Sequence, residues 1–171
     1  VLEHPSYKES DYTLPLALGI GIDGKYVCED LSALPHLLLA GSSGSGKTVA
    51  LNVMLLSLIY KKTPEELNLV LIDPKRVEFS LYKGIPHLLG DVVTDMDESV
   101  HVLEELIEEM ENRYQTFQDV KVTKISEYNL EVKKNKRMPH IAVFIDELGD
   151  LMLSHGKRVE DLLGRLSQKA R

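Results

Sequence analysis

The feature that most constrains the fold is an eight-residue motif, GSSGSGKT, at Gly41–Thr48. It fills the template G-x-x-x-x-G-K-[ST] at every fixed position. Its glycines let the backbone turn tightly and approach a phosphate group, while backbone N–H groups point inward at the start of a helix. An apolar run, HLLLA at 36–40, precedes the motif, and a helical pattern at 48–61 follows it. A Gly/Ser-rich linker would lack these flanks, so the sequence predicts a phosphate-binding loop between a short buried strand and a helix.

Each residue type in this motif has an expected role. In loops of this kind the lysine, here Lys47, reaches the β- and γ-phosphates, and the hydroxyl of Thr48 binds Mg²⁺. We expect ATP rather than GTP, because no guanine-specific N/TKxD pattern occurs. The expected nucleotide-binding residues are Gly41, Ser42, Ser43, Gly44, Ser45, Gly46, Lys47, Thr48 and Val49.

Two further stretches end an apolar run in an acid, LVLIDPK at 69–75 and IAVFIDE at 141–147. A nucleotide-hydrolysing site needs one acid near its metal and a second group to orient or deprotonate water. The second stretch supplies both on consecutive residues. We therefore predict that Asp146 faces Mg²⁺ and that Glu147 acts as the general base.

The other acid, Asp73, is followed at once by Pro74 and by a cation, Lys75. We expect Asp73 to close its strand and to order the following turn. Lys75 would pair with Asp73 or reach toward another subunit or DNA. Chemistry alone leaves these alternatives for Lys75 open.

Strand-like and helix-like patterns alternate along the chain, which predicts an α/β fold with a mainly parallel sheet. An Asp23-Gly24 turn between two strands indicates a β-hairpin before this pattern begins. We predict a hairpin segment at 1–35 and an ATPase core at 36–171. The further elements expected are strands at 69–73 and 141–146 and helices at 94–117, with a Thr94/Asp97 capping box, and at 157–169.

The bulk properties set limits on the class of protein. The 171 residues have a net charge of −7, which argues against a protein that coats nucleic acid with its whole surface. No secretion signal or membrane span is visible, and the single Cys28 fits a reducing compartment. The most basic stretch is interpreted as a solvated loop in preference to a DNA-tracking loop. It contains Lys121, Lys124, Lys133, Lys134, Lys136 and Arg137.

Several stretches together resemble the motor domain of the FtsK/SpoIIIE family of DNA translocases. They are PHLLLAGSSGSGKTVALN, LVLIDPKRVEFSLYKGIPHLLGDVVTD, EMENRYQTF, EYN, IAVFIDELGDLM and LLGRLSQKAR, in family order from about Leu14 to Arg171. The resemblance implies a RecA-like P-loop ATPase that forms hexameric rings around double-stranded DNA in chromosome segregation. It also implies that Lys47 and Thr48 belong to Walker A, and Asp146 and Glu147 to Walker B.

The same resemblance suggests a role for Arg171, which ends the LSQKAR stretch. It is either an arginine finger that reaches a neighbouring subunit's nucleotide or a cation favoured at a helix C-terminus. Arg165 is the weaker candidate for such a finger. Intact family members are tethered to the membrane at the division septum, so this chain would be a cytoplasmic part whose anchor lies elsewhere.

The chain departs from the family pattern in what it lacks. Family members carry membrane helices, a winged-helix DNA reader and a further strand after the position of QKAR, so we expect a fragment. The alternative function is a type VII secretion ATPase, which shares this core and would respond to a secreted peptide. A non-hydrolysing module is disfavoured because Lys47, Thr48, Asp146 and Glu147 are intact. The GIPHLL and VVTD stretches favour the DNA motor.

Overall fold

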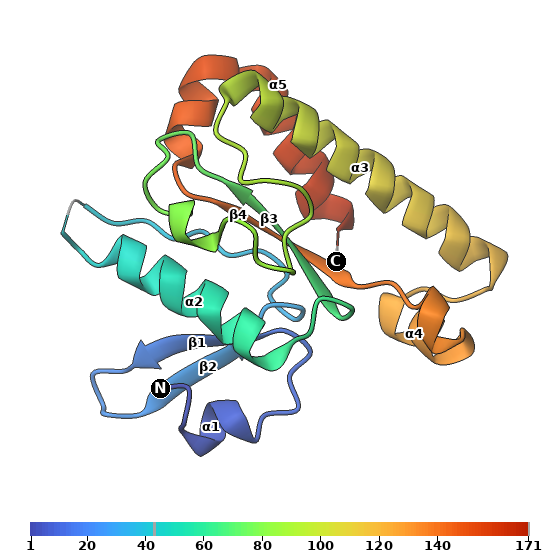
Figure 1. Ribbon diagram of the computed structural model, residues 1–171, viewed down its shortest axis with the longest axis horizontal. Helices are drawn as coiled ribbons and strands as arrows, with labels where there is room; N and C mark the ends of the chain where they lie inside the picture. The colour runs from blue at the N-terminus through green and yellow to red at the C-terminus, as the bar shows by residue number, and fades with distance from the viewer. Residues whose placement is uncertain (43, 171) are drawn as a thin grey trace. The chain divides into compact units, whose positions relative to one another are not determined.

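The protein, seen here as a computed structural model, divides into two compact units, residues 1–63 and 64–170 (Figure 1). Residues 1–42 and 44–170 are described. The two units are taken one at a time below. The predicted division into a hairpin segment and an ATPase core stays a prediction.

The first unit is a β-hairpin with two helices. Its elements are α1 (Pro5–Lys8), β1 (Pro15–Ile20), β2 (Tyr26–Asp30) and α2 (Lys47–Lys61). β1 and β2 are antiparallel, and Gly24 adopts a φ of 78° in the turn between them. Such a φ is easily reached only without a side chain. The predicted hairpin and the predicted helix after the loop are both confirmed.

The packing of the first unit joins α2 to β1. Leu16 and Ala17 of β1 and Leu55 and Leu58 of α2 are fully buried. The Ser57 hydroxyl accepts a hydrogen bond from the Ala17 backbone N–H at 3.1 Å. One apolar face of α2 therefore packs against β1. This packing fixes the position of the first turn of α2 and of the loop before it.

The expected strand at 36–40 is wrong. No strand forms there, and Leu37 and Leu38 are 46% and 78% exposed. A strand exists only through hydrogen bonds to a neighbouring strand. Among the described residues, β1 pairs with β2, and the two remaining strands, β3 (Leu67–Ile72) and β4 (His140–Ile145), pair with each other. No described strand therefore pairs with this segment. An apolar run bounded by Pro and Gly was therefore not enough to define a strand.

The second unit carries a parallel pair of strands. Its elements are β3 (Leu67–Ile72), η1 (Ser80–Tyr82), α3 (Met96–Asp119), α4 (Ile125–Glu131), η2 (Lys134–Lys136), β4 (His140–Ile145) and α5 (Leu148–Lys169). β3 and β4 run parallel in a register that places Leu67 beside His140 and Ile72 beside Ile145. The predicted α/β class with a parallel sheet is confirmed.

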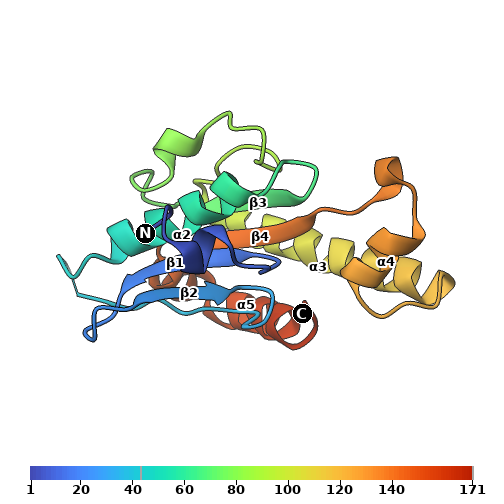
Figure 2. The same ribbon diagram turned by 90° about the horizontal axis from the view of Figure 1, so that it is seen from below.

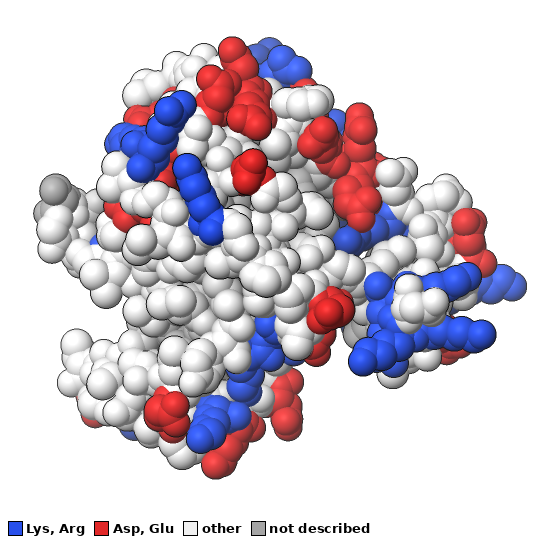
Figure 3. Space-filling model, viewed as in Figure 1, with Lys and Arg blue, Asp and Glu red and all other residues white. Residues whose placement is uncertain are grey.

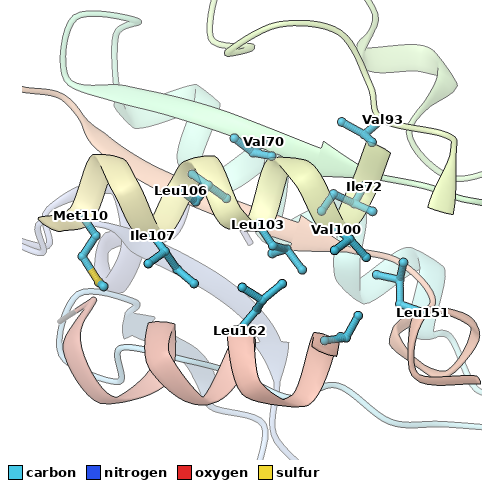
Figure 4. Close-up of a cluster of buried hydrophobic side chains, with 11 residues drawn as sticks. Val70, Ile72, Val93, Val100, Leu103, Leu106, Ile107, Met110, Leu151 and Leu162 are labelled. Atoms are coloured by element: carbon cyan, nitrogen blue, oxygen red, sulfur yellow. The ribbon is translucent and has the colours of Figure 1, made fainter. Parts of the chain in front are cut away.

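The core of the second unit lies between β3 and the helices α3 and α5 (Figure 4). On α3 the buried side chains recur every three or four residues, so one stripe of the helix faces the core. The buried cluster consists of Val70, Ile72, Val93, Val100, Leu103, Leu106, Ile107, Met110, Leu151, Val159 and Leu162. This packing holds the carboxyl ends of both strands in place.

Two helix starts differ from the expectation. The N-cap of α3 is Asp95, whose Oδ1 accepts from the Glu98 backbone N–H at 3.0 Å, so the cap lies one residue after Thr94. α5 begins at Leu148, well before Lys157, and continues through a non-helical residue, His155. Figure 2 shows α4 beyond the C-terminal end of α3.

Candidate functional site

The phosphate-loop motif lies at the N-terminus of α2 in the first unit. Gly44 and Gly46 have φ values of 78° and 92°, in the left-handed region that favours glycine. Gly46 is the N-cap of α2 and has no side chain with which to cap the helix. The positive end of the helix dipole therefore faces the loop, as in anion-binding helix starts.

Local hydrogen bonds define the turn that leads into the helix. The Ser45 N–H donates to the Ser42 carbonyl at 3.0 Å, and the Ala50 N–H donates to the Gly46 carbonyl at 2.9 Å. Thr48 and Val49 are exposed, Lys47 is half-buried, and the described loop residues before them are exposed. The loop is accessible to a ligand. Ser43 lies outside the described residues.

The two acids that follow β3 and β4 share one edge of the sheet in the second unit. Asp73 comes directly after β3 and Asp146 directly after β4. The Asp146 N–H donates to the Ile72 carbonyl at 3.0 Å, which extends the parallel ladder to the strand ends. Parallel strands bring their carboxyl ends to the same edge, where α/β proteins bind ligands.

Asp73 and Asp146 differ in burial, which indicates that they have different roles. Asp73 is fully buried, and its Oδ2 accepts from the Phe79 N–H at 3.0 Å. Its carbonyl accepts from the Arg76 N–H at 3.0 Å, so Asp73 organises the turn after β3 as expected. Asp146 is only half-buried. Its role as a metal ligand stays a prediction.

Lys75 contacts the carboxylate predicted to be the general base. Its Nζ lies 3.2 Å from Glu147 Oε2 and 3.3 Å from Asp150 Oδ2, near the start of α5. Hydrogen bonds to Glu147 and then to Asp150 raise the pKa of Lys75. Within the chain, Lys75 therefore pairs with Glu147 and Asp150 and not with Asp73, while contact with another subunit or DNA stays a prediction. The pairing of Ile72 with Ile145 explains this contact, because it brings the residues after β3 beside those after β4. Knowledge of this register would have been needed to predict the contact.

The residues predicted to bind Mg²⁺, Thr48 in the first unit and Asp146 in the second, carry oxygen donors. The proposed ligands are the Thr48 hydroxyl and the Asp146 carboxylate, both oxygen donors of the kind Mg²⁺ prefers alongside phosphate oxygens and water. Residues 1–42 and 44–170 contain no group of three His, Cys, Asp or Glu side chains arranged to hold a metal. A magnesium ion bound mainly through a nucleotide does not require such a group.

The second unit also contains a hollow away from the two strand-end acids. It measures about 490 Å³ and is open to solvent between β3 and α3. Its lining includes Asp91, Glu98, Glu105 and Glu109 against one cation, Arg113. Carboxylates at this density repel a triphosphate, so the hollow is not a nucleotide site. Arg165 is exposed on α5, and Arg171 lies outside the described residues.

The chain matches the model of the FtsK/SpoIIIE family over residues 1–171. Proteins named DNA translocase FtsK are similar along its whole length. The Campylobacter jejuni protein is 47% identical over 173 residues, the Helicobacter pylori protein 45% over 173, and the Pseudomonas aeruginosa protein 42% over 195. The chain spans 18%, 20% and 24% of those relatives, about a fifth of their length.

Two solved structures share the fold. A monomer of the pCW3 conjugation coupling protein TcpA with ATPγS has a TM-score of 0.75 and 25% identity, over 95% of this chain and 46% of that one. The cytoplasmic domain of the type VII secretion ATPase EccC from Thermomonospora curvata has a TM-score of 0.77 and 25% identity, over 93% and 20%. Both likenesses confirm the predicted fold class, that of RecA-like P-loop ATPases, and support an ATPase. No described helix is long and apolar enough to cross a membrane.

Proposed function

Because the chain belongs to the FtsK/SpoIIIE family, we propose that it is part of a Mg²⁺-dependent ATPase that moves along double-stranded DNA. One observation supports this most strongly. Relatives named DNA translocase are 42–47% identical to the chain and match it along its entire length. The chain is a fraction of those proteins, so the motor is a property of the intact protein that contains it.

The proposed nucleotide site uses the phosphate loop and the acids after β4. Residues 41–49 would hold the ATP phosphates through backbone N–H groups, and Lys47 would neutralise charge on the β- and γ-phosphates. When bound, Mg²⁺ would supply positive charge that stabilises the negatively charged phosphate groups. Thr48 and Asp146 are its proposed ligands, and Glu147 is the group proposed to take a proton from the attacking water.

The proposed assembly is a hexameric ring around double-stranded DNA. Within it, Arg171 is proposed either to stabilise charge at a neighbouring subunit's nucleotide or to serve only as a helix-end cation. We also propose that the intact protein acts at the division septum, tethered to the membrane by parts outside this chain. These proposals rest on the family.

A second candidate function is protein export. It is supported by the likeness to the type VII secretion ATPase, at a TM-score of 0.77. That structure is 25% identical to the chain, whereas the DNA translocases reach 47%. Sequence similarity therefore favours the DNA motor, and the response to DNA separates the two.

The test is ATP turnover by the intact protein with and without long double-stranded DNA, with Lys47→Ala as the control. We expect DNA to raise turnover severalfold and the Lys47→Ala variant to lose about a hundredfold or more. Turnover that ignores DNA but responds to an exported polypeptide would move the assignment to secretion. Unchanged ATP turnover in the Lys47→Ala variant would overturn the assignment of the phosphate loop as the nucleotide site.

A further inference from the structure

The most basic stretch of the sequence forms a compact surface on the second unit. Residues 121–137 contain five lysines and one arginine against Glu127 and Glu131, a net charge of +4 in a chain whose total is −7. All six cations are exposed. We call them the α4 basic surface, made of Lys121, Lys124, Lys133, Lys134, Lys136 and Arg137. Figure 3 shows Lys and Arg side chains gathered on this part of the second unit.

The cations of this surface are not neutralised by ion pairs in the described part of the chain. None of the six forms an ion pair in the described part of the molecule, while other lysines there pair with carboxylates, as Lys75 does with Glu147 and Lys169 with Glu111. Like charges gathered this closely repel one another unless they face an anion. The surface is therefore suited to an outside partner of high negative charge.

The segment is held in place at both ends, unlike a loose lysine-rich loop. The Asn129 side chain donates to the Met138 carbonyl and accepts from the Met138 N–H, both at 2.8 Å. The guanidinium of Arg113 on α3 donates to the Pro139 carbonyl at 2.7 Å. Tyr128 is buried, with its ring 5.6 Å from that of Phe117. Such bracing lowers the entropy lost when a partner binds.

The beginning of the surface has an unusual backbone. Lys121 directly follows Val120, the C-cap of α3, and adopts a left-handed φ of 61°; its N–H donates to the Gln118 carbonyl at 3.1 Å. Glycine occupies this position of a helix end more readily than lysine. A Lys121→Gly variant therefore removes a charge without harming the helix end.

The chemistry of the surface points to a phosphate backbone. Within residues 121–137 the only exposed large hydrophobic side chain is Leu130, so the apolar centre of a protein–protein interface is missing. The one aromatic residue, Tyr128, is buried, so no platform exists for stacking single-stranded bases. Lysines on long flexible stems meet phosphates as point charges and carry no base specificity.

We propose that the α4 basic surface binds the phosphate backbone of double-stranded DNA without reading its sequence. The inference rests on the proposed function, which names duplex DNA as the partner. It adds a place of contact, on the segment between α3 and β4.

The test is binding of the chain to a fluorescent duplex of mixed sequence between about 0.05 and 0.2 M salt. The variant is the triple change Lys133→Ala, Lys134→Ala and Lys136→Ala. Its matched control, Lys25→Ala, Lys83→Ala and Lys157→Ala, removes three exposed lysines elsewhere, with the same change in net charge. Circular dichroism verifies that each variant is folded.

We expect the triple variant to bind about tenfold more weakly or worse, with its slope of log affinity against log salt reduced by about 2 to 3, near 0.9 for each lost phosphate contact. Lys121→Gly should reduce the slope by about 1, and the control should leave it unchanged. Equal losses in variant and control would overturn the inference. So would unchanged binding in the variant.

Failure of this inference can be distinguished from failure of the proposed function. If DNA stimulates ATP turnover but the triple variant binds like the unmodified chain, the motor stands and the α4 basic surface is not its DNA contact. If the unmodified chain fails to bind the duplex and DNA fails to stimulate the intact protein, both ideas are overturned. Binding to an acidic polypeptide but not to duplex DNA would overturn this inference in favour of a protein partner.

Discussion

The Nζ atom of Lys75 lies 3.2 Å from Oε2 of Glu147, so the segment after β3 holds the carboxylate at the end of β4. The proposed general base is thereby paired with a cation. Both side chains are partly exposed, at 50% and 34%. Pairs of this kind are weak and easily opened, which suits a contact that restrains the base until water and nucleotide are in place.

The first prediction follows from this pair. A Lys75→Met change should raise ATP turnover in the absence of DNA by about two- to fivefold, the range expected for an exposed ion pair. Lys75→Arg keeps the charge and should behave like the unmodified protein. Phosphate release measured across a range of pH tests both. Lys83→Met, an exposed lysine elsewhere on this unit, is the control, and a fall in turnover with Lys75→Met would contradict the restraining role.

The second prediction separates the two strand-end acids. Asp73→Ala removes the acceptor of the Phe79 N–H from a fully buried position, and an unpaired buried donor costs about 1–3 kcal/mol. The free energy of unfolding, measured in urea, should fall by that amount. Asp146→Asn should reduce ATP turnover about a hundredfold or more with a smaller change in stability.

The opposite result would identify Asp73, in place of Asp146, as the ligand of Mg²⁺. If Asp73→Asn, which keeps an oxygen facing the Phe79 N–H, abolished turnover at unchanged stability, Asp73 would be the residue that serves Mg²⁺. A fully buried side chain committed to a turn makes that result unexpected.

The third prediction concerns pH and the first unit. The Tyr7 hydroxyl donates to the Ser57 carbonyl of α2 at 2.5 Å, and burial raises the pKa of Tyr7 to about 12. In the unfolded chain the phenol ionises near its ordinary value of 10.0. The stabilisation from Tyr7 is therefore fully present below pH 10 and is lost as pH rises toward 12.

A Tyr7→Phe variant tests this pH dependence. It should lose about 1 kcal/mol of stability at neutral pH, the usual value of one buried hydrogen bond. The difference from the unmodified chain should shrink above pH 10. Tyr12→Phe, at an exposed tyrosine, is the control, and a difference that grew with pH would contradict the assignment.

The fourth prediction tests the bracing of the α4 segment. Asn129→Ala removes two hydrogen bonds to Met138, each worth about 0.5–1.5 kcal/mol, so the free energy of unfolding should fall by about 1–3 kcal/mol. Asn135→Ala, at an exposed position of η2, should change it by less than about 0.5 kcal/mol. Faster amide exchange at Met138 in Asn129→Ala alone would confirm local opening. Equal effects of the two changes would show that Asn129 does not brace the segment.

The parts predicted from sequence are those that local chemistry determines. The GSSGSGKT motif predicted a helix, and α2 begins at Lys47, because glycine at left-handed positions and a helix start are properties of a few adjacent residues. The hairpin around Asp23-Gly24 and the α/β alternation followed from equally local patterns. The turn-forming role of Asp73 was also foreseen from its neighbour, Pro74.

One expectation that was wrong involves partners distant in sequence. The run HLLLA has the composition of a strand, yet pairing decides whether a strand forms, and none of the described strands pairs with it. The other difference is local: the cap of α3 is Asp95 in place of Thr94, and its Oδ1 accepts from the Glu98 N–H. Composition cannot decide either outcome.

The sequence by itself determined the family, the phosphate-loop motif and the two adjacent acids after β4, because each depends on residue type and spacing along a short segment. Only the tertiary structure decided that Asp73 is buried in a turn, that Lys75 pairs with Glu147, and that Asn129 braces the α4 basic surface. These contacts join residues that parallel pairing and helix packing bring together. Hydrogen bonds and ion pairs act over a few ångströms in space, whatever the separation along the chain.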